Sequence, residues 1–300
     1  MPRDLEYRVQ SRCGLLDYLA SQQPSRSRKR AKELLRFGAV TVLGKSRIRH
    51  DTQLETGDIV RIANRDTVRI GQIDLQGLRI VHLDDSVVVV EKPAGLLSIG
   101  SGAEKEKTAH RILNEYLKAL VKSDSQQAFI VHRLDRETSG LIIFARSEVI
   151  QTTLQRDWKS VTKKYLAVVE GVPPNSRGTL KDNLLETGSL LVRRVSKGGE
   201  PAITHYLVRD SRGDFSLLEI TLETGRKHQI RVQLAGIGHP VAGDGKYGAR
   251  TDPARRLALH SCMLSFTHPV SGARMEFRSA LPQRLQALVG RGRAPRARIE

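Results

Sequence analysis

One short polar stretch, His-Arg-Leu-Asp-Arg-Glu-Thr-Ser-Gly at 132–140, has the residue types that could do chemistry. It places five ionisable side chains between two apolar runs, 129–131 and 141–145. Ionisable groups are costly to hold between buried strands unless partners compensate them. Asp135, at the end of the first expected strand, would be rigid and partly desolvated, which suits a nucleophile or a base. The alternative is a structural aspartate that binds turn amides or Arg133.

The composition predicts a globular protein with a polyanionic partner. The chain has 300 residues, 39 % of them hydrophobic, and a net charge of +18. This length suffices for one large domain and a small one. So strong a positive charge favours nucleic acid as the partner, although excess lysine and arginine can also serve solubility alone.

The sequence lacks the motifs of disulfide-rich, metal-binding, nucleotide-binding, secreted and membrane-spanning proteins. Two cysteines without clustered Cys/His spacing predict neither a disulfide framework nor a metal site. The Gly-rich stretches 100–102 and 243–248 lack nucleotide-binding spacing, so we expect no cofactor. The N-terminus lacks the apolar region of a signal peptide, and the apolar runs are too short to span a bilayer. We therefore expect a cytoplasmic protein without a membrane association.

The N-terminal part predicts a small α+β domain at 13–72, preceded by a polar tail at 1–12. Its pattern gives two helices and closing strands, with Ala31, Leu34 and Leu35 on one helix face. This segment resembles the S4 RNA-binding domain in its basic helix, its strand-turn "GAVTVLGK" and its "GDIV" ending. The alternative is an amphipathic helix whose solvated face is basic. The resemblance implies phosphate contacts from the basic side chains Arg26, Arg28, Lys29, Lys32 and Arg36.

After a linker at 73–79, residues 80–285 predict a larger domain. Strand-like runs alternate with amphipathic helices expected at about 107–122 and 147–160, and a strand is expected at 163–171. The end of the chain, 286–300, is basic without an apolar pattern, and we expect a disordered tail.

Four ordered motifs of this larger domain resemble those of the pseudouridine synthases of the large-ribosomal-RNA type. The first stretch fits H-R-L-D-x-x-T-S-G at every fixed position. The others are "VVVVEKPAGLLS" at 87–98, "KKYLAVVEG" at 163–171 and "TGRKHQIRVQLAGIGHPVAGDGKYG" at 224–248. The resemblance implies an α+β catalytic domain built on a mixed, mainly antiparallel sheet.

The resemblance also implies a reaction without a cofactor or a metal. A uridine in RNA is detached at its N-glycosidic bond, and the uracil is rejoined through C5. Asp135 matches the catalytic carboxylate, which attacks the ribose C1′ or removes a ribose proton; the sequence does not choose. Arg231 matches the arginine that pairs with this aspartate, and Tyr165 matches the tyrosine that lies against the base. Each of the two, taken alone, could be structural.

Other residues of the motifs have two interpretations each. Arg133 would bind the phosphate of the flipped nucleotide or enter the vacated stack, or else brace the turn. Lys92 would contact backbone phosphate or be merely solvated, and His132 is expected to be structural. Gln233 stands where the family more often has histidine, so no titrating role is assigned there.

The target uridine must leave its stack to reach Asp135, so we expect base flipping and RNA binding that salt weakens. Ribosomal RNA is the expected partner, transfer RNA the alternative, and a monomer the expected state. Two other functions fit the sequence: a non-catalytic RNA-binding factor of ribosome assembly, and an RNA N-glycosylase that releases uracil.

Overall fold

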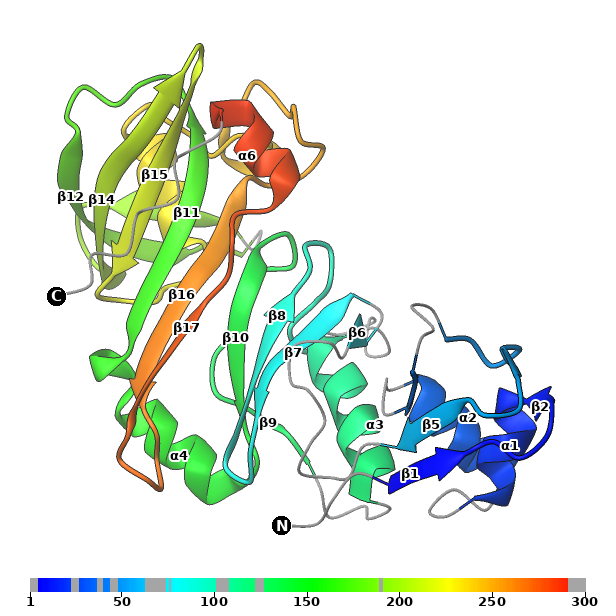
Figure 1. Ribbon diagram of the computed structural model, residues 1–300. Coiled ribbons are helices and arrows are strands. Elements are labelled where there is room, and N and C mark those ends of the chain that lie inside the picture. Colours follow the sequence, from blue (N-terminus) through cyan, green and yellow to red (C-terminus); the bar gives the residue numbers. More distant parts are fainter. Residues whose placement is uncertain are drawn as a thin grey trace, which may run out of the picture.

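The described residues form two units (Figure 1), and no hydrophobic core is shared between them. The structure is a computed structural model, and it describes residues 5–22, 27–36, 40–43, 48–62, 74–75, 77–100, 108–121, 127–188 and 191–290. One core contains only residues up to Ile62, and the main core begins at Leu75. Among the described residues, no helix is long and apolar enough to cross a membrane.

The N-terminal unit is a small α+β structure. Helices α1 (Leu15–Ser21) and α2 (Arg28–Arg36) pack on an antiparallel sheet of order β1-β5-β3. Leu15, Leu19, Ala31 and Leu34 face the shared core, and for Ala31 and Leu34 the helical spacing predicts this. The strands are β1 (Leu5–Arg8), β3 (Val40–Val42) and β5 (Ile59–Ile62), with a second pair formed by β2 (Cys13–Gly14) and β4 (Gln53–Leu54).

The predicted tail at 1–12 is wrong from Leu5 onward. Residues Leu5–Arg8 form β1 and pair antiparallel with β5, and Val9 is buried in the same core. The partner strand lies more than 50 positions away, so local polarity gave no sign of the pairing. Residues 1–4 lie outside the described part of the chain.

The larger unit is built on a 12-stranded sheet, shown from one side in Figure 1. Its order is β13-β12-β14-β15-β11-β16-β10-β8-β7-β6, with β17 paired to β16 and β9 paired to β10. Every pairing between its named strands is antiparallel except that of β10 with β16. The predicted α+β class with a mixed, mainly antiparallel sheet is therefore confirmed. The strands are β6 (Asp74–Leu75), β7 (Leu78–Leu83), β8 (Val87–Lys92), β9 (Phe129–Ile130), β10 (Ser139–Ala145), β11 (Thr162–Glu170), β12 (Arg177–Glu186), β13 (Val192–Val195), β14 (Glu200–Arg212), β15 (Phe215–Leu222), β16 (Leu259–Thr267) and β17 (Arg274–Arg278).

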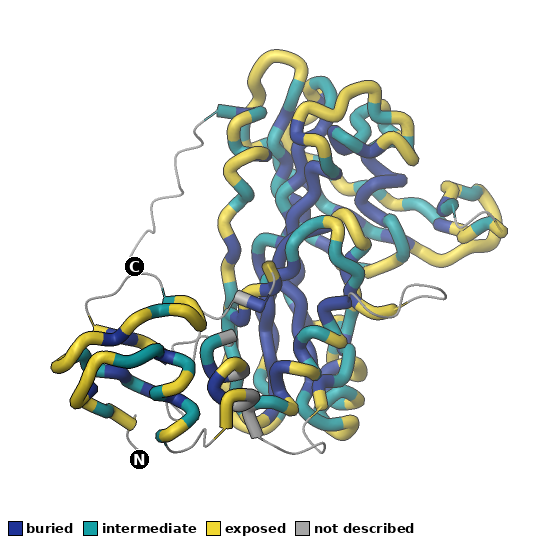
Figure 2. Tube along the Cα trace, turned by 90° about the vertical axis from the view of Figure 1, so that its right-hand side faces the viewer, coloured by how far each residue is buried: buried dark blue, intermediate teal, exposed yellow. Residues whose placement is uncertain are grey.

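The central strands are buried on both faces, as the dark blue core in Figure 2 shows. In β8, Val88 and Val90 pack with helix α3 (Ala109–Val121), whereas Val87 and Val89 pack with α4 (Glu148–Arg156) on the other face. This two-sided burial explains the unbroken run of valines, because a strand exposed on one face would alternate with polar residues. A 3₁₀ turn at Trp158–Ser160 follows α4.

Two predicted boundaries of the larger domain are wrong. The expected linker at 73–79 contains β6 and the start of β7, which pair with each other. The expected tail at 286–300 begins inside helix α6 (Gln283–Val289), whose Leu285 and Val289 are buried in the main core. Residues 291–300 lie outside the described residues.

Gly140 allows the one parallel contact between these named strands. It has φ +112°, and a Cβ built on it would lie 2.2 Å from the backbone oxygen of Ser261. Glycine alone tolerates both this conformation and this approach. The contact joins the start of β10 to β16, directly after the turn that contains Asp135.

We predict that Gly140→Ala destabilises the larger unit by at least about 2 kcal/mol, because the new methyl group overlaps backbone atoms that cannot move away. Urea unfolding followed by the fluorescence of Trp158 measures this, since it is the single tryptophan of the chain. Gly188→Ala is the control, because a Cβ at Gly188 meets nothing within 4 Å. Equal unfolding midpoints for the two variants would refute the packing argument.

Candidate functional site

The turn that carries Asp135 is clamped by the segment that follows β8. Ser98 accepts a hydrogen bond from the backbone N–H of Leu134 and donates one to its carbonyl, at 3.1 and 2.8 Å. The N–H of Gly95 donates to the carbonyl of Arg136 at 2.9 Å. Within the turn, the N–H of Thr138 donates to the carbonyl of Asp135 at 3.1 Å. The first two motifs therefore act together to fix the backbone at Asp135.

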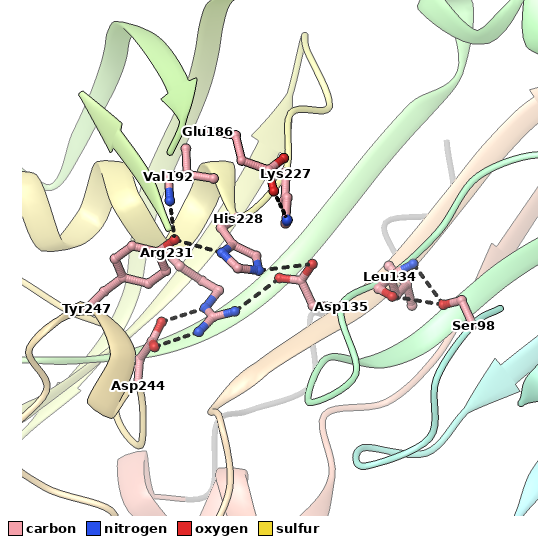
Figure 3. A network of polar contacts seen from close by, with 10 residues as sticks. All are labelled: Ser98, Leu134, Asp135, Glu186, Val192, Lys227, His228, Arg231, Asp244 and Tyr247. Carbon is pink, nitrogen blue, oxygen red and sulfur yellow. Dashed lines mark hydrogen bonds and ion pairs between the residues drawn. The ribbon is translucent and has the colours of Figure 1, made fainter. Parts of the chain in front are cut away.

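Asp135 turns its carboxylate into a pocket and meets two side chains of a distant segment (Figure 3). Nη1 of Arg231 lies 3.3 Å from its Oδ2, and Nε2 of His228 lies 3.9 Å from its Oδ1. The side chain of Asp135 keeps 23 % of its surface exposed, so the group is reachable from solvent.

Arg231 belongs to helix α5 (Gln229–Gly236) and is held from its other side by Asp244. Its Nε and Nη2 donate to the two oxygens of Asp244 at 2.6 and 2.7 Å, a bidentate ion pair in which Asp244 is 1 % exposed. Burial alone would lower the pKa of Arg231, but its hydrogen bonds and ion pairs with Asp244 and Asp135 outweigh burial and raise it. The guanidinium stays charged and is fixed in orientation.

His228 and Tyr247 complete the wall beside Arg231. The hydroxyl of Tyr247 lies 2.6 Å from Nδ1 of His228 and accepts the backbone N–H of Val192 at 3.1 Å. The ring of Tyr247 lies 5.0 Å from the guanidinium carbon of Arg231, a cation–π distance. His228 precedes α5 with φ 53°, a left-handed conformation that is uncommon for histidine.

Tyr165 forms part of the same pocket from strand β11. It is 8 % exposed, and burial together with the charge of Asp135 raises the pKa of its phenol. The pairing of β11 with β16 shifts register between Lys164 and Tyr165. Such an irregularity re-aims a side chain relative to its neighbours. The phenol is protonated near neutral pH.

The structure thus brings the three expected catalytic residues Asp135, Tyr165 and Arg231 into one pocket, although they are far apart in the sequence. Arg133 is exposed and also forms part of the pocket lining. His132 is not part of the pocket lining: its ring lies 4.5 Å from that of Trp158 in a tilted contact, and it accepts the N–H of Ile143. Burial lowers the pKa of His132 to about 3, so the ring is neutral.

The expected phosphate contact of Lys92 is wrong. Lys92 is 0 % exposed, and its ammonium donates to the carbonyls of Pro93, Leu96 and Arg136 at 2.9, 2.7 and 3.0 Å. These three acceptors use all three of its hydrogens. Burial lowers the pKa of Lys92 to about 7. This lysine therefore joins the clamp on the turn of Asp135 and does not reach the surface.

The basic residues expected to bind RNA in α2 are described in part. Arg28 is 70 % exposed and pairs with Asp17 at 2.5 Å, and Lys32 is exposed. Arg26 lies outside the described residues, as do the side chains of Lys29 and Arg36.

Gln233 lies on α5 but outside the pocket lining. Its amide accepts from Thr204 at 2.6 Å and donates to Asp182 at 2.9 Å and to the carbonyl of Ala202 at 3.1 Å. Gln233 is buried, and it ties the helix to β12 and β14. A histidine is not needed for this structural role.

The sequence analysis missed Asp244, Tyr247 and His228. All three lie in the motif at 224–248, but none of them was singled out within it. A useful signal was the isolated Asp244 in a Gly-rich turn, 13 positions after Arg231. The described residues contain no group of three or more His, Cys, Asp or Glu side chains placed to hold a metal ion.

Comparisons with known proteins agree with this geometry. The family model described as RNA pseudouridylate synthase matches residues 86–236. The RNA pseudouridine synthase YlyB of Bacillus subtilis is 33 % identical over 278 residues, which cover 91 % of each chain. The ribosomal large subunit pseudouridine synthase D of Vibrio cholerae is 33 % identical over 282 residues, 85 % of this chain and 84 % of the relative.

Solved structures show the same fold. The human RNA pseudouridylate synthase domain containing 4 superposes with a TM-score of 0.59 and 25 % identity, over 70 % of this chain and 92 % of its own. The family model matches half of the chain, and the two bacterial relatives match most of it. The chain therefore belongs to the RNA pseudouridylate synthase family and is an isomerase that acts on RNA.

Proposed function

We propose that the chain isomerises uridines of large-subunit ribosomal RNA and that Asp135 is its catalytic carboxylate. The observation that carries this proposal is the pairing of Asp135 with Arg231 in a pocket that Tyr165 also lines. A carboxylate bound by a fixed cation keeps one orientation, which a group reacting at a sugar carbon needs.

The reaction exchanges one bond of the ribose for another. The bond from N1 of uracil to C1′ breaks, the base turns within the pocket, and C5 bonds to C1′. The hydrogen of C5 leaves as a proton and N1 gains one, so substrate and product are isomers. Asp135 either attacks C1′ or removes a ribose proton. In both cases its charge faces a sugar that becomes electron-poor.

Tyr165 supports the base in this proposal by offering a stacking face. The raised pKa of its phenol disfavours a phenolate that would take the C5 proton, and a neutral hydroxyl can still donate a hydrogen bond. Arg133, exposed beside the pocket, is placed to bind the phosphate of a flipped nucleotide or to fill the vacated stack. Loops and bulges of RNA reduce the cost of flipping.

The N-terminal unit supplies a second RNA contact in this proposal. Its two helices, small sheet and basic helix α2 support the resemblance to an S4 domain. We assign residues 5–62 to this domain and 74–290 to the catalytic domain, from the two separate cores. Several relatives are named for the ribosomal large subunit, which favours ribosomal over transfer RNA.

Tritium release from unmodified ribosomal RNA that carries [5-³H]uridine tests the proposed chemistry. The wild-type protein is expected to release tritium, whereas Asp135→Asn loses at least about a thousandfold in rate, because the amide cannot serve as a nucleophile or a base. Asp214→Asn is the matched control, since this exposed aspartate lies in the turn between β14 and β15.

The same assay separates the alternatives. Free uracil in the supernatant would identify an N-glycosylase. RNA binding without tritium release from ribosomal or transfer RNA would favour an assembly factor. Full activity in Asp135→Asn would refute the assignment of the carboxylate.

Removing two positive charges from α2 tests the second RNA contact. The double variant Arg28→Ala/Lys32→Ala is expected to weaken RNA binding and to reduce the slope of log K against log salt by about 2, because two phosphate contacts and their counterions are lost. Fluorescence anisotropy over a salt series measures both quantities.

Arg156→Ala/Lys159→Ala is the control for that series, because it removes the same charge from exposed positions near the end of α4. If both double variants change the slope equally, binding depends on total charge and the proposed contact of α2 is wrong.

A further inference from the structure

His228 lies in the pocket but has no part in the chemistry proposed above. Its ring faces a different group from each nitrogen: Nδ1 lies 2.6 Å from the hydroxyl of Tyr247, and Nε2 lies 3.9 Å from Oδ1 of Asp135. Arg231 bonds the other oxygen, Oδ2. The two oxygens of Asp135 therefore have different neighbours, and His228 faces the one that Arg231 leaves open (Figure 3).

A chain of hydrogen bonds determines which nitrogen of His228 carries the proton. The backbone N–H of Val192 donates to the oxygen of Tyr247 at 3.1 Å. A phenol has one hydrogen to donate, and within the described part of the chain Nδ1 of His228 is the acceptor it reaches. Because Nδ1 accepts this hydrogen, the neutral ring has its own proton on Nε2. That N–H faces Asp135.

The surroundings of the two side chains favour a neutral His228 ring and a protonated Tyr247 hydroxyl. Burial is the main reason that the pKa of His228 is lowered, and the positive charges of Arg231, Lys246 and Lys227 lower it further, whereas Asp135 opposes them. Burial likewise raises the pKa of Tyr247, so its hydroxyl keeps the hydrogen that it donates. The imidazole is neutral near neutral pH.

We infer that His228 is a positioning residue for Asp135, held in the Nε2–H tautomer by Tyr247, and that it restrains Oδ1 of the carboxylate. The inference rests on the proposed role of Asp135. A movement of about 1 Å brings the 3.9 Å separation to hydrogen-bond length, and such contacts commonly tighten when substrate binds. The left-handed backbone of His228 is a second sign, since uncommon conformations persist where the surrounding structure enforces them.

Two substitutions remove the ends of this connection; Tyr247→Phe also removes the acceptor of the Val192 N–H. His228→Asn keeps a residue type that tolerates the left-handed conformation and can still meet Tyr247, but it lacks an atom that reaches Asp135. Tyr247→Phe keeps the ring beside Arg231 and removes only the hydroxyl. His50→Asn, at an exposed position of the N-terminal unit, is the control.

Steady-state tritium release gives the kinetic part of the test. Each single variant is expected to lose about 10-fold or more in kcat with little change in KM, because orientation of the carboxylate is lost and not the binding of RNA. The double variant should be no slower than the slower single variant, because both changes break one connection. Unchanged kcat, or multiplied losses in the double variant, would overturn the inference.

A measurement without turnover separates this inference from the proposed function. In protein labelled with ¹⁵N-histidine, the ring signals of His228 are assigned by their absence from His228→Asn. They should show a neutral ring protonated at Nε2 at pH 7, and Tyr247→Phe should change this tautomer. An Nδ1–H ring or an imidazolium would overturn the inference even if the enzyme is active. An active Asp135→Asn would instead contradict the proposed function.

Discussion

The site depends on a single guanidinium that two carboxylates share. Arg231 is 9 % exposed, and an arginine buried to this degree is costly unless it is paired on all sides. Asp244 binds it in a bidentate pair, which leaves Nη1 directed toward Asp135. The more buried carboxylate therefore serves structure, while the more exposed one stays reachable from the pocket.

The sheet brings Asp135, Arg231 and Asp244 together. The turn of Asp135, the start of α5 and the loop of Asp244 belong to separate parts of the chain, and Arg231 lies 96 positions from Asp135. They meet near the parallel contact of β10 with β16. The two strands can approach there because Gly140 has no side chain. Lys92 and Ser98 then fix the turn through its backbone. Rigid strands therefore position a short loop, which is how precise sites are commonly built.

The α+β class and the grouping of Asp135, Tyr165 and Arg231 could be predicted because four ordered motifs resemble those of one known family, and this resemblance implies both. The sequence did not reveal Asp244, the buried partner of Arg231. Asp244 contacts Arg231 only because the fold brings its turn against α5. The local sequence around Asp244 does not show that the two side chains meet. Lys92 follows four valines and a glutamate, so local polarity suggested a solvated end of a strand. Two of its carbonyl partners, Pro93 and Leu96, lie just after it, but the third, Arg136, is brought by a remote turn that the local pattern does not contain. Strand β1 was missed for the same reason, since its partner is remote.

The claim that Asp244 holds Arg231 for Asp135 is tested most directly by the turnover of Asp244→Asn in protein shown to be folded by its thermal unfolding. We expect a loss of about 100-fold in kcat, because an amide at position 244 leaves the guanidinium of Arg231 free to move toward Asp135 and to displace its carboxylate from the reactive orientation. A folded Asp244→Asn protein with the kcat of the wild type would show that Asp135 needs no arginine held by Asp244.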